Sequence, residues 1–119
     1  MHTSSETYSA KTIIIATGGS HKKLGIPGEE EFSGKGVSYC AVCDGNFFRE
    51  QNEVVVGGVD AALDEGTYLS GITNKVTIIH RRDKLRASQI LQERAFSNPK
   101  IDFLWNHVVE EFQGDALLN

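Results

Sequence analysis

The sequence predicts an α/β fold built on a parallel sheet, and two observations carry this prediction. From residue 53 onward, strand-like apolar runs alternate with helix-like segments, an order that implies parallel strands joined by right-handed crossovers. A glycine pair, Gly57 and Gly58, stands where one such strand would pass into a helix. With 119 residues, the chain has room for one small domain or for part of a larger one.

The first predicted element is a strand over residues 11–16. This β-branched run ends at Thr17-Gly18-Gly19, a pattern typical of a buried strand followed by a tight turn. Only a polar tail precedes it, so we expect an orphan strand without its own sheet. An unpaired apolar strand seeks backbone partners, and we expect it to add to an exposed edge of the domain or to pair between chains.

The next two segments are predicted to contain little regular structure. Residues 20–35 are polar and contain several glycines, which predicts a loop that could serve as a linker. Residues 37–43 predict a strand end that runs into the first turn of a helix. The dipeptide Asp44-Gly45 should break that helix.

From residue 53 the predicted order becomes regular. Apolar β-rich runs indicate strands, and a stripe of apolar residues followed by Asn98-Pro99 indicates a helix and its end. The predicted strands cover residues 53–56, 75–79, 101–105 and 108–112, and the predicted helices cover residues 60–69 and 87–96.

Composition excludes several classes of protein. The chain is 39% hydrophobic and 24% charged, which describes a globular protein and excludes a disordered one. A net charge of −4 offers no overall basic field for nucleic acid or an acidic membrane surface. No apolar run approaches the ~20 residues needed to span a bilayer, and no export signal is visible at the start. We therefore expect a cytoplasmic protein with no nucleic-acid or membrane partner.

The glycine turn is the first chemical signal. Between a strand and a helix, backbone N–H groups and the helix amino end can hold a pyrophosphate, as in Rossmann-like folds. The dinucleotide fingerprint would place glycines at 57 and 59 and a small residue at 62, but position 59 is Val59. A branched side chain there should obstruct the phosphates. The alternative is an ordinary strand-to-helix turn.

A basic cluster follows the second strand of this unit, where a dinucleotide fold reads the ribose 2′ position. Guanidinium groups suit a 2′-phosphate through charge-assisted hydrogen bonds, so the cluster favours NADP over NAD. The alternatives are a solvated basic surface and, for the histidine, a simple cap on the strand. The sequence of the cluster is His80-Arg81-Arg82-Asp83-Lys84-Leu85-Arg86.

The two cysteines, Cys40 and Cys43, give the third signal. Thiols at this spacing can close a small reversible disulfide, and a helix amino end would favour the thiolate that attacks other disulfides. Asp44 could return a proton to the leaving thiol. A zinc site needs about four ligands, and the four histidines show no paired spacing, so we expect no metal. Two inert buried thiols remain an alternative.

Together these motifs resemble the pyridine-nucleotide domain of low-molecular-weight thioredoxin reductases, from residue 12 to about residue 115. The matching motifs are A-T-G-G at 16–19, G-I-P-G-E-E at 25–30, C-A-V-C-D-G at 40–45, G-G-V-D-A-A at 57–62, H-R-R-D-K-L-R-A-S at 80–88 and N-P-K-I at 98–101.

The resemblance implies a role for each motif. Cys40 would attack the disulfide of thioredoxin, Cys43 would face a flavin, and Asp44 would be their acid-base partner. The residues implied to border the pyrophosphate of NADP(H) are Gly57, Gly58, Asp60 and Ala61. Those implied to surround the 2′-phosphate are His80, Arg81, Arg82 and Arg86.

The resemblance also implies that this chain is a piece of a larger enzyme. In that family a hydride passes from NADPH to FAD and then to the disulfide, and the parent enzyme is expected to be a homodimer. Residues 1–36 would contain a tail, a strand of an absent FAD domain and a linker. Residues 37–119 would form an incomplete NADPH-binding domain that carries the two cysteines. We expect such a chain to be inactive by itself.

Two other functions remain open. One is a nucleotide-binding module with no catalysis of its own. The other is the flavoprotein subunit of a peroxide-reducing system, which shares the dithiol and the fold. That family generally uses NADH, so the basic residues from His80 to Arg86 argue against it.

Overall fold

The core of the structure is a parallel sheet of three strands. The computed structural model describes residues 2–118. Strands β1 (Asn52–Val56), β2 (Lys75–His80) and β3 (Ile101–Trp105) lie in the order β1-β2-β3, and both pairings are parallel. The predicted α/β class with a parallel sheet is therefore confirmed, together with three of the predicted strands.

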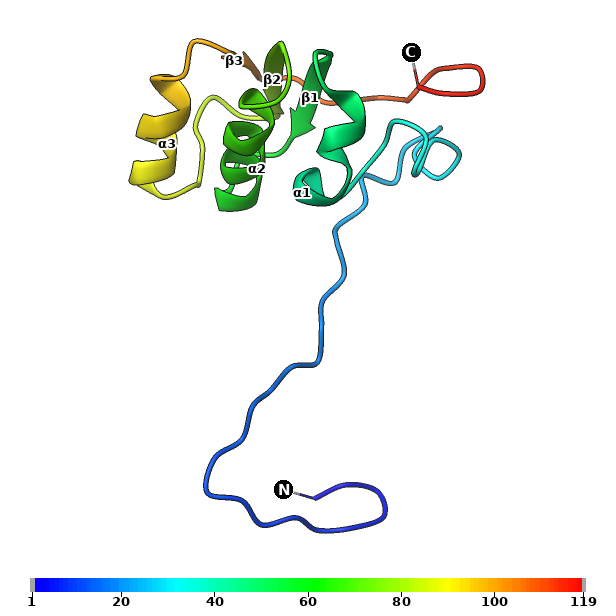
Figure 1. Cartoon of the computed structure of the whole chain (residues 1–119), viewed down its shortest axis with the longest axis vertical. Helices are drawn as coiled ribbons and strands as arrows, with labels where there is room; N and C mark the ends of the chain where they lie inside the picture. Colours follow the sequence, from blue (N-terminus) through cyan, green and yellow to red (C-terminus); the bar gives the residue numbers. More distant parts are fainter. Residues whose placement is uncertain (1, 119) are drawn as a thin grey trace.

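Helices connect the strands along one side of this sheet. α2 (Asp60–Ser70) joins β1 to β2, and α3 (Gln89–Phe96) joins β2 to β3. The short α1 (Ala41–Asp44) precedes β1 and continues as a 3-10 helix over Gly45–Phe48. Figure 1 shows α1, α2 and α3 side by side. The predicted helices are confirmed, although α3 begins two residues later than expected, after Ser88.

Burial follows from this one-sided arrangement. In β2, Val76 and Ile78 are fully buried under α2 and α3, where they meet Leu63 and Ala95. Each such aliphatic side chain contributes about 1.5–3 kcal/mol by leaving water. Within residues 2–118, no helix covers the opposite face of the sheet, and Val54 in β1 is 56% exposed there. The side chains that hold the fold thus lie between the sheet and the helices.

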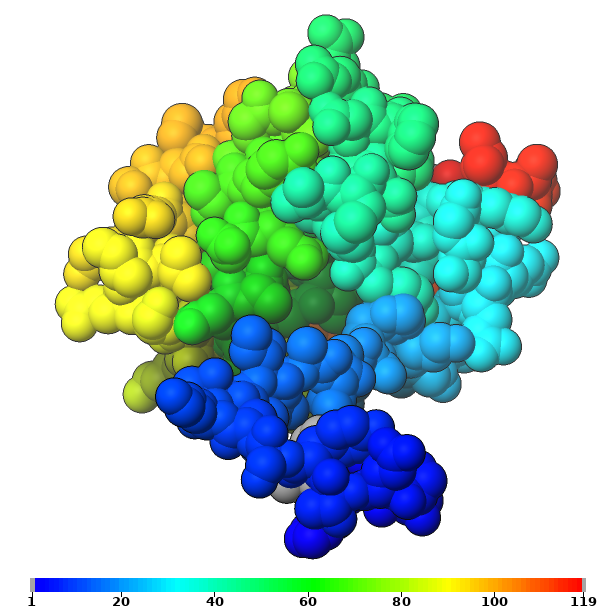
Figure 2. Space-filling model, turned by 60° about the horizontal axis from the view of Figure 1, so that its bottom comes forward, coloured from blue at the N-terminus to red at the C-terminus, as the bar shows by residue number. Residues whose placement is uncertain are grey.

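The predicted strand over residues 11–16 is wrong for this structure. Residues 8–20 form no strand, and Ile14 is 91% exposed. The segment extends away from the domain (Figure 1), and its blue atoms lie in the lower part of Figure 2. The radius of gyration is 18.0 Å, against about 13.5 Å expected for a compact domain of this length. The run finds no partner at either edge of the sheet of its own chain.

The predicted strand over residues 108–112 is also wrong. After β3 the chain turns at Asn106, which has a φ of 59°, and leaves the sheet. Single backbone hydrogen bonds then tie it to the loop before α1, from Phe112 N–H to the Pro27 carbonyl and from Leu118 N–H to the Lys35 carbonyl. Its apolar residues therefore have no strand beside them to complete a ladder.

Within the described residues, no helix has the length and apolar character needed to cross a membrane.

Candidate redox and nucleotide-binding sites

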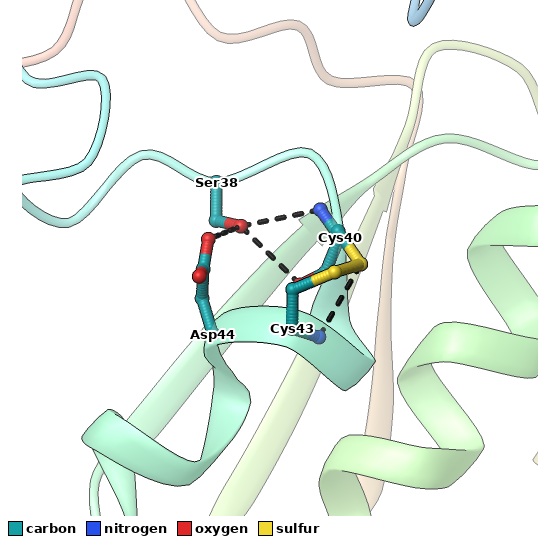
Figure 3. Close-up of a disulfide and its surroundings, with 4 residues drawn as sticks. All are labelled: Ser38, Cys40, Cys43 and Asp44. Atoms are coloured by element: carbon teal, nitrogen blue, oxygen red, sulfur yellow. Dashed lines mark hydrogen bonds between the residues drawn. A yellow bond between two sulfur atoms is a disulfide. The ribbon is translucent and has the colours of Figure 1, made fainter.

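The two cysteines form a disulfide at the start of α1. Cys40 is the N-cap of this helix in an extended conformation, and the backbone N–H of Cys43 donates to the Cys40 sulfur at 3.3 Å. Cys43 is exposed and Cys40 is half-buried. Figure 3 shows the pair with its neighbours. The alternative of two inert buried thiols does not fit a bonded pair that solvent reaches.

A serine links the disulfide to Asp44. The Ser38 hydroxyl donates to the Asp44 carboxylate and accepts the backbone N–H of Cys40 at 3.2 Å (Figure 3). A hydroxyl can donate and accept at once, so Ser38 holds the carboxylate next to the cysteine pair. The sequence analysis missed Ser38. Its only signal was a hydroxyl two residues before the first cysteine.

Close packing fixes α1 and the 3-10 helix on α2. Ala41 is buried in the core, and a Cβ at Gly45 would lie 2.8 Å from a Leu69 methyl and 3.2 Å from one of Ile72. Only glycine allows this approach. α1 ends at Asp44, but the chain does not break there as predicted, because Gly45 keeps a helical conformation and begins the 3-10 helix. Gly45 also allows the redox helix to pack against the carboxyl end of α2.

The loop before the cysteines is organised around one buried glutamate. Glu29 accepts hydrogen bonds from the N–H groups of Leu24 and Gly25 at 2.8 and 2.6 Å, and from the Tyr39 hydroxyl at 2.9 Å. Burial raises the pKa of this carboxyl, but the donors outweigh burial and hold its pKa below the usual value. Tyr39 also stacks on His21. Glu29 thus supports the residue next to Cys40.

The Asp44 side of the disulfide faces a shallow hollow of about 160 Å³. Phe47 stands at this hollow and is 79% exposed. The carboxylate is therefore open to an approaching molecule. The hollow is lined by Gly34, Gly36, Val37, Ser38, Asp44, Phe47 and Phe48.

The glycine turn lies at the carboxyl end of β1, beside the carboxyl end of β2. The N–H of Gly57 donates to the Ile79 carbonyl at 3.1 Å, and a Cβ at position 57 would lie 2.6 Å from that of Ala62. Ala62 therefore provides the close strand-to-helix packing that the fingerprint requires at its third position. Ala61, in the first turn of α2, is exposed.

Val59 is the N-cap of α2 and has an ordinary extended conformation, with φ −115° and ψ 179°. Its side chain is 43% exposed and makes no capping hydrogen bond. The first N–H groups of α2 thus have no side-chain acceptor at the N-cap, which leaves donors for an anion. That Val59 obstructs a pyrophosphate remains a prediction.

The basic residues lie beside this turn, because β1 and β2 are paired up to Val56 and Ile79. Arg81, Arg82 and Arg86 are exposed, and among residues 2–118 none of the three forms an ion pair. His80 differs, because its ring is buried and only 8% exposed. The structure thus brings the glycine turn and the three arginines to one edge of the sheet.

No hydrogen bond or ring contact within residues 2–118 joins the disulfide to the glycine turn. A search of the same residues finds no group of three or more histidine, cysteine or acidic side chains that could hold a metal ion.

Comparison with known families gives one match that spans almost the whole chain. The family model described as pyridine nucleotide-disulphide oxidoreductase matches residues 2–118. Among curated relatives, the thioredoxin reductase of Listeria innocua is 66% identical over 112 residues, which is 94% of this chain and 35% of that protein. The thioredoxin reductase of Bacillus subtilis is 61% identical over 107 residues, 90% of this chain and 34% of that protein.

Solved structures agree with these relatives. Thioredoxin reductase from Lactococcus lactis, in its FR conformation, superposes with a TM-score of 0.83 at 56% identity, covering 85% of this chain and 33% of that one. Thioredoxin reductase from Streptococcus pyogenes superposes with a TM-score of 0.81 at 58% identity, covering 90% of this chain and 35% of that one. This chain therefore spans about a third of the length of the proteins that it matches.

Proposed function

The chain belongs to the pyridine nucleotide-disulphide oxidoreductase family, and from this premise we propose that it carries the dithiol and the nucleotide-binding region of an NADPH-dependent thioredoxin-disulfide reductase. Residues 37–119 would be the nucleotide-binding part, and residues 1–36 would belong to a flavin-binding part. We expect the whole enzyme to be a cytoplasmic homodimer that takes thioredoxin as its substrate. The observation that carries the proposal is the accessible Cys40–Cys43 disulfide with Asp44 held beside it.

The dithiol step follows from the placement of these groups. In the reduced chain, the Cys40 thiolate attacks one sulfur of the partner disulfide, and a mixed disulfide forms as the partner's other sulfur leaves. Asp44 supplies the proton that the leaving thiolate takes up. Cys43 then gives its proton to the Asp44 carboxylate and attacks the Cys40 sulfur, which closes the Cys40–Cys43 disulfide; the partner's second sulfur leaves and takes up that proton. One electron pair passes to the partner.

The residues at the glycine turn fit a nicotinamide dinucleotide. The turn presents uncapped N–H groups at the start of α2, and Gly57 keeps the backbone open where a side chain would collide with Ala62. Gly57, Gly58 and the first turn of α2 would hold the pyrophosphate, while Arg81, Arg82 and Arg86 would hold the 2′-phosphate. When bound, the nicotinamide supplies a hydride, which a flavin relays to the disulfide.

The dithiol step can be tested on this chain without any cofactor. The chain is reduced, freed of reductant and mixed with oxidised bacterial thioredoxin. We expect Cys43→Ser to trap a mixed disulfide through Cys40, because the resolving thiol is gone, and Cys40→Ser to trap none. Trapping by Cys40→Ser instead would reverse the two roles. Failure of the reduced wild-type chain to reduce thioredoxin would contradict the proposal.

Ser38→Ala provides a sharper variant of the same test. It removes the hydroxyl that positions Asp44 and leaves both cysteines in place. We expect slower thiol transfer, by about three- to tenfold for a lost hydrogen bond of this kind. Ser38→Thr keeps a hydroxyl and should retain most of the rate. Equal rates for all three proteins would show that Ser38 does not assist Asp44.

The electron path from NADPH is tested separately. We expect no NADPH oxidation by this chain with thioredoxin, with or without added FAD, because residues 2–36, which we propose belong to a flavin-binding part, form no helix or strand in this structure. Appreciable turnover would refute this expectation. Calorimetric comparison of NADPH binding with NADH binding separates the proposal from a peroxide-reducing flavoprotein, which would prefer NADH.

A nucleotide-binding module without catalysis is the second candidate function. Val59 bears on it, because this side chain would determine how tightly such a module holds its nucleotide. Calorimetric titration with NADP should show weak binding by the wild type and tighter binding by Val59→Gly, because the phosphates can then approach the backbone. Equal affinity would show that this side chain does not obstruct the cofactor.

A further inference from the structure

Two hydrogen bonds tie the segment after β2 to the glycine turn, and a third ties it to His80 at the end of β2. We call residues 81–88 the basic loop and residues 57–60 the glycine turn. The Arg86 N–H donates to the Gly58 carbonyl at 2.8 Å, and the Ser88 N–H donates to the Asp60 carboxylate at 2.6 Å. The third bond joins the His80 Nε2 to the Lys84 carbonyl at 3.1 Å. The basic loop is therefore held from its middle to its carboxyl end.

His80 is enclosed between these two segments. A Cβ at Gly58 would lie 2.2 Å from the His80 Nδ1 and 2.3 Å from its Cε1, so the ring packs directly on the backbone of the turn. The other nitrogen, Nε2, faces a carbonyl oxygen. Because a carbonyl can only accept, Nε2 carries the proton and donates it. Trp105 lies beside the ring in a T-shaped arrangement, with 6.2 Å between the ring centroids. With only 8% of the residue exposed, His80 offers little surface to a phosphate.

Asp60 performs a related task at the start of α2. Its carboxylate accepts the N–H of Ser88, the residue that precedes α3. The bond thus joins the amino ends of two helices that flank the proposed cofactor. A free carboxylate in this place would repel a pyrophosphate, whereas one that is directed to a backbone N–H is partly neutralised. Asp60 is therefore placed to organise the site and not to contact the anion.

From these contacts we propose that His80 and Asp60 are positioning residues, which hold the basic loop on the glycine turn so that both bind the nucleotide as one rigid unit. The proposal rests on the nucleotide-binding function proposed above. It differs from a direct role of His80 at the 2′-phosphate. The exposed arginines would contact the 2′-phosphate, while His80 would support the turn that holds the pyrophosphate.

NAD separates the two roles, because it has the pyrophosphate and lacks the 2′-phosphate. A ligand of the 2′-phosphate affects only NADP, whereas a residue that supports the turn affects both nucleotides. By calorimetry we expect His80→Ala to weaken NAD and NADP alike, each by about five- to tenfold. His80→Gln keeps a side-chain N–H donor and should recover most of this loss. A loss confined to NADP in both variants would overturn the proposal.

Asp60 is tested with a matched pair and a control. We expect Asp60→Ala to weaken NADP by about fivefold, and Asp60→Asn, which keeps the acceptor oxygen, to bind nearly as the wild type does. Asp64→Ala removes an exposed carboxylate one turn further along α2 and should change nothing. Tighter binding by both Asp60 variants would show that the carboxylate only repels the phosphates, which would overturn its positioning role.

Amide hydrogen exchange tests, without any nucleotide, whether Asp60 holds the basic loop on the glycine turn. In Asp60→Ala the Ser88 and Arg86 amides should exchange at least about tenfold faster than in the wild type, while the Ile78 amide in the core of the sheet confirms that the variant is folded. Unchanged exchange at Ser88 and Arg86 would overturn the proposal. Failure of the wild type to bind either nucleotide would instead contradict the proposed function, and the exchange result would still stand.

Discussion

Two β-branched runs in this chain have similar residues and opposite fates. In β2, Val76 and Ile78 are fully buried, whereas Ile14 and Ile15 near the amino end are 91% and 83% exposed and belong to no strand. β-propensity describes how well a residue fits a pleated, partly buried surface. The contrast shows that such a run becomes a strand only where neighbouring strands and a covering layer are supplied.

The difference lies in partners and burial. β2 is central in the sheet and pairs with β1 and β3 on its two sides, while α2 and α3 cover its apolar face. Residues 9–20 make no backbone hydrogen bond with other described residues. Water solvates their backbone, and their isoleucines gain no transfer free energy. The segment therefore contributes little to the stability of the domain.

The sharpest test of this contrast exchanges one isoleucine for alanine in each region. We expect Ile78→Ala to lower the free energy of unfolding by about 2–5 kcal/mol, because it leaves a cavity in the core. The matched variant Ile14→Ala should change it by less than about 0.5 kcal/mol. Urea denaturation of both variants measures the difference. A comparable loss in Ile14→Ala would mean that residues 11–16 pack against something in solution.

The sequence analysis succeeded where local pattern and tertiary partners agree. The predictions are confirmed for β1, β2, β3, α2 and α3. In each of these elements the apolar residues have a neighbouring element in the same chain to pack against. It failed at residues 11–16 and 108–112, where the pattern is strand-like and no neighbouring strand is present. Periodicity reports the surface that a segment can form, but it does not report whether another segment lies there to pair with it.

The sites were predictable to a similar extent. Spacing alone indicated the Cys40–Cys43 pair and the glycine turn. The supporting contacts could not be found, because they join residues through backbone atoms or across long separations. Asp60 meets the N–H of Ser88, 28 positions away, and Ser38 reaches Asp44 only after α1 has formed. Such contacts depend on the folded geometry and leave no periodic signal.

Glu29 lies between the extended amino-end segment and the folded domain. A substitution there should change how far the ordered structure reaches toward the amino end. Glu29→Gln removes a carboxylate that accepts from Leu24, Gly25 and Tyr39. We expect the amides of Leu24 and Gly25 to lose protection and to exchange about tenfold faster or more. The amide of Ile78 should keep its protection. Glu31→Gln, at an exposed position, is the control. Unchanged exchange at Leu24 and Gly25 would place the boundary elsewhere.

Acid should reproduce this shift in the wild type. Because the folded pKa of Glu29 lies below its ordinary value, the carboxylate stabilises the loop above the unfolded-state pKa. The stabilisation is lost as pH falls through the lower folded pKa. As the pH falls, we therefore expect the loop around Leu24 to lose order before the sheet does. NMR chemical shifts of the two regions measure this difference. In Glu29→Gln this acid transition of the loop should be absent.

The smallest expected effect lies inside the folded region, at Glu53 in β1. Burial raises the pKa of its carboxyl, so the folded state prefers the protonated form. Stability from this group is therefore present at low pH and declines as pH rises from the unfolded-state pKa to the higher folded one. Glu53→Gln removes the buried charge, and at neutral pH it should stabilise the domain by a few tenths of a kcal/mol, about the size of other partly exposed charge effects. Urea denaturation at neutral pH and in acid should show a gain that disappears in acid, while Asp64→Asn on exposed α2 gives no such dependence. A gain that persists in acid would assign the effect to packing of the amide and not to the charge, and β1 would then hold a half-buried carboxylate without cost in stability.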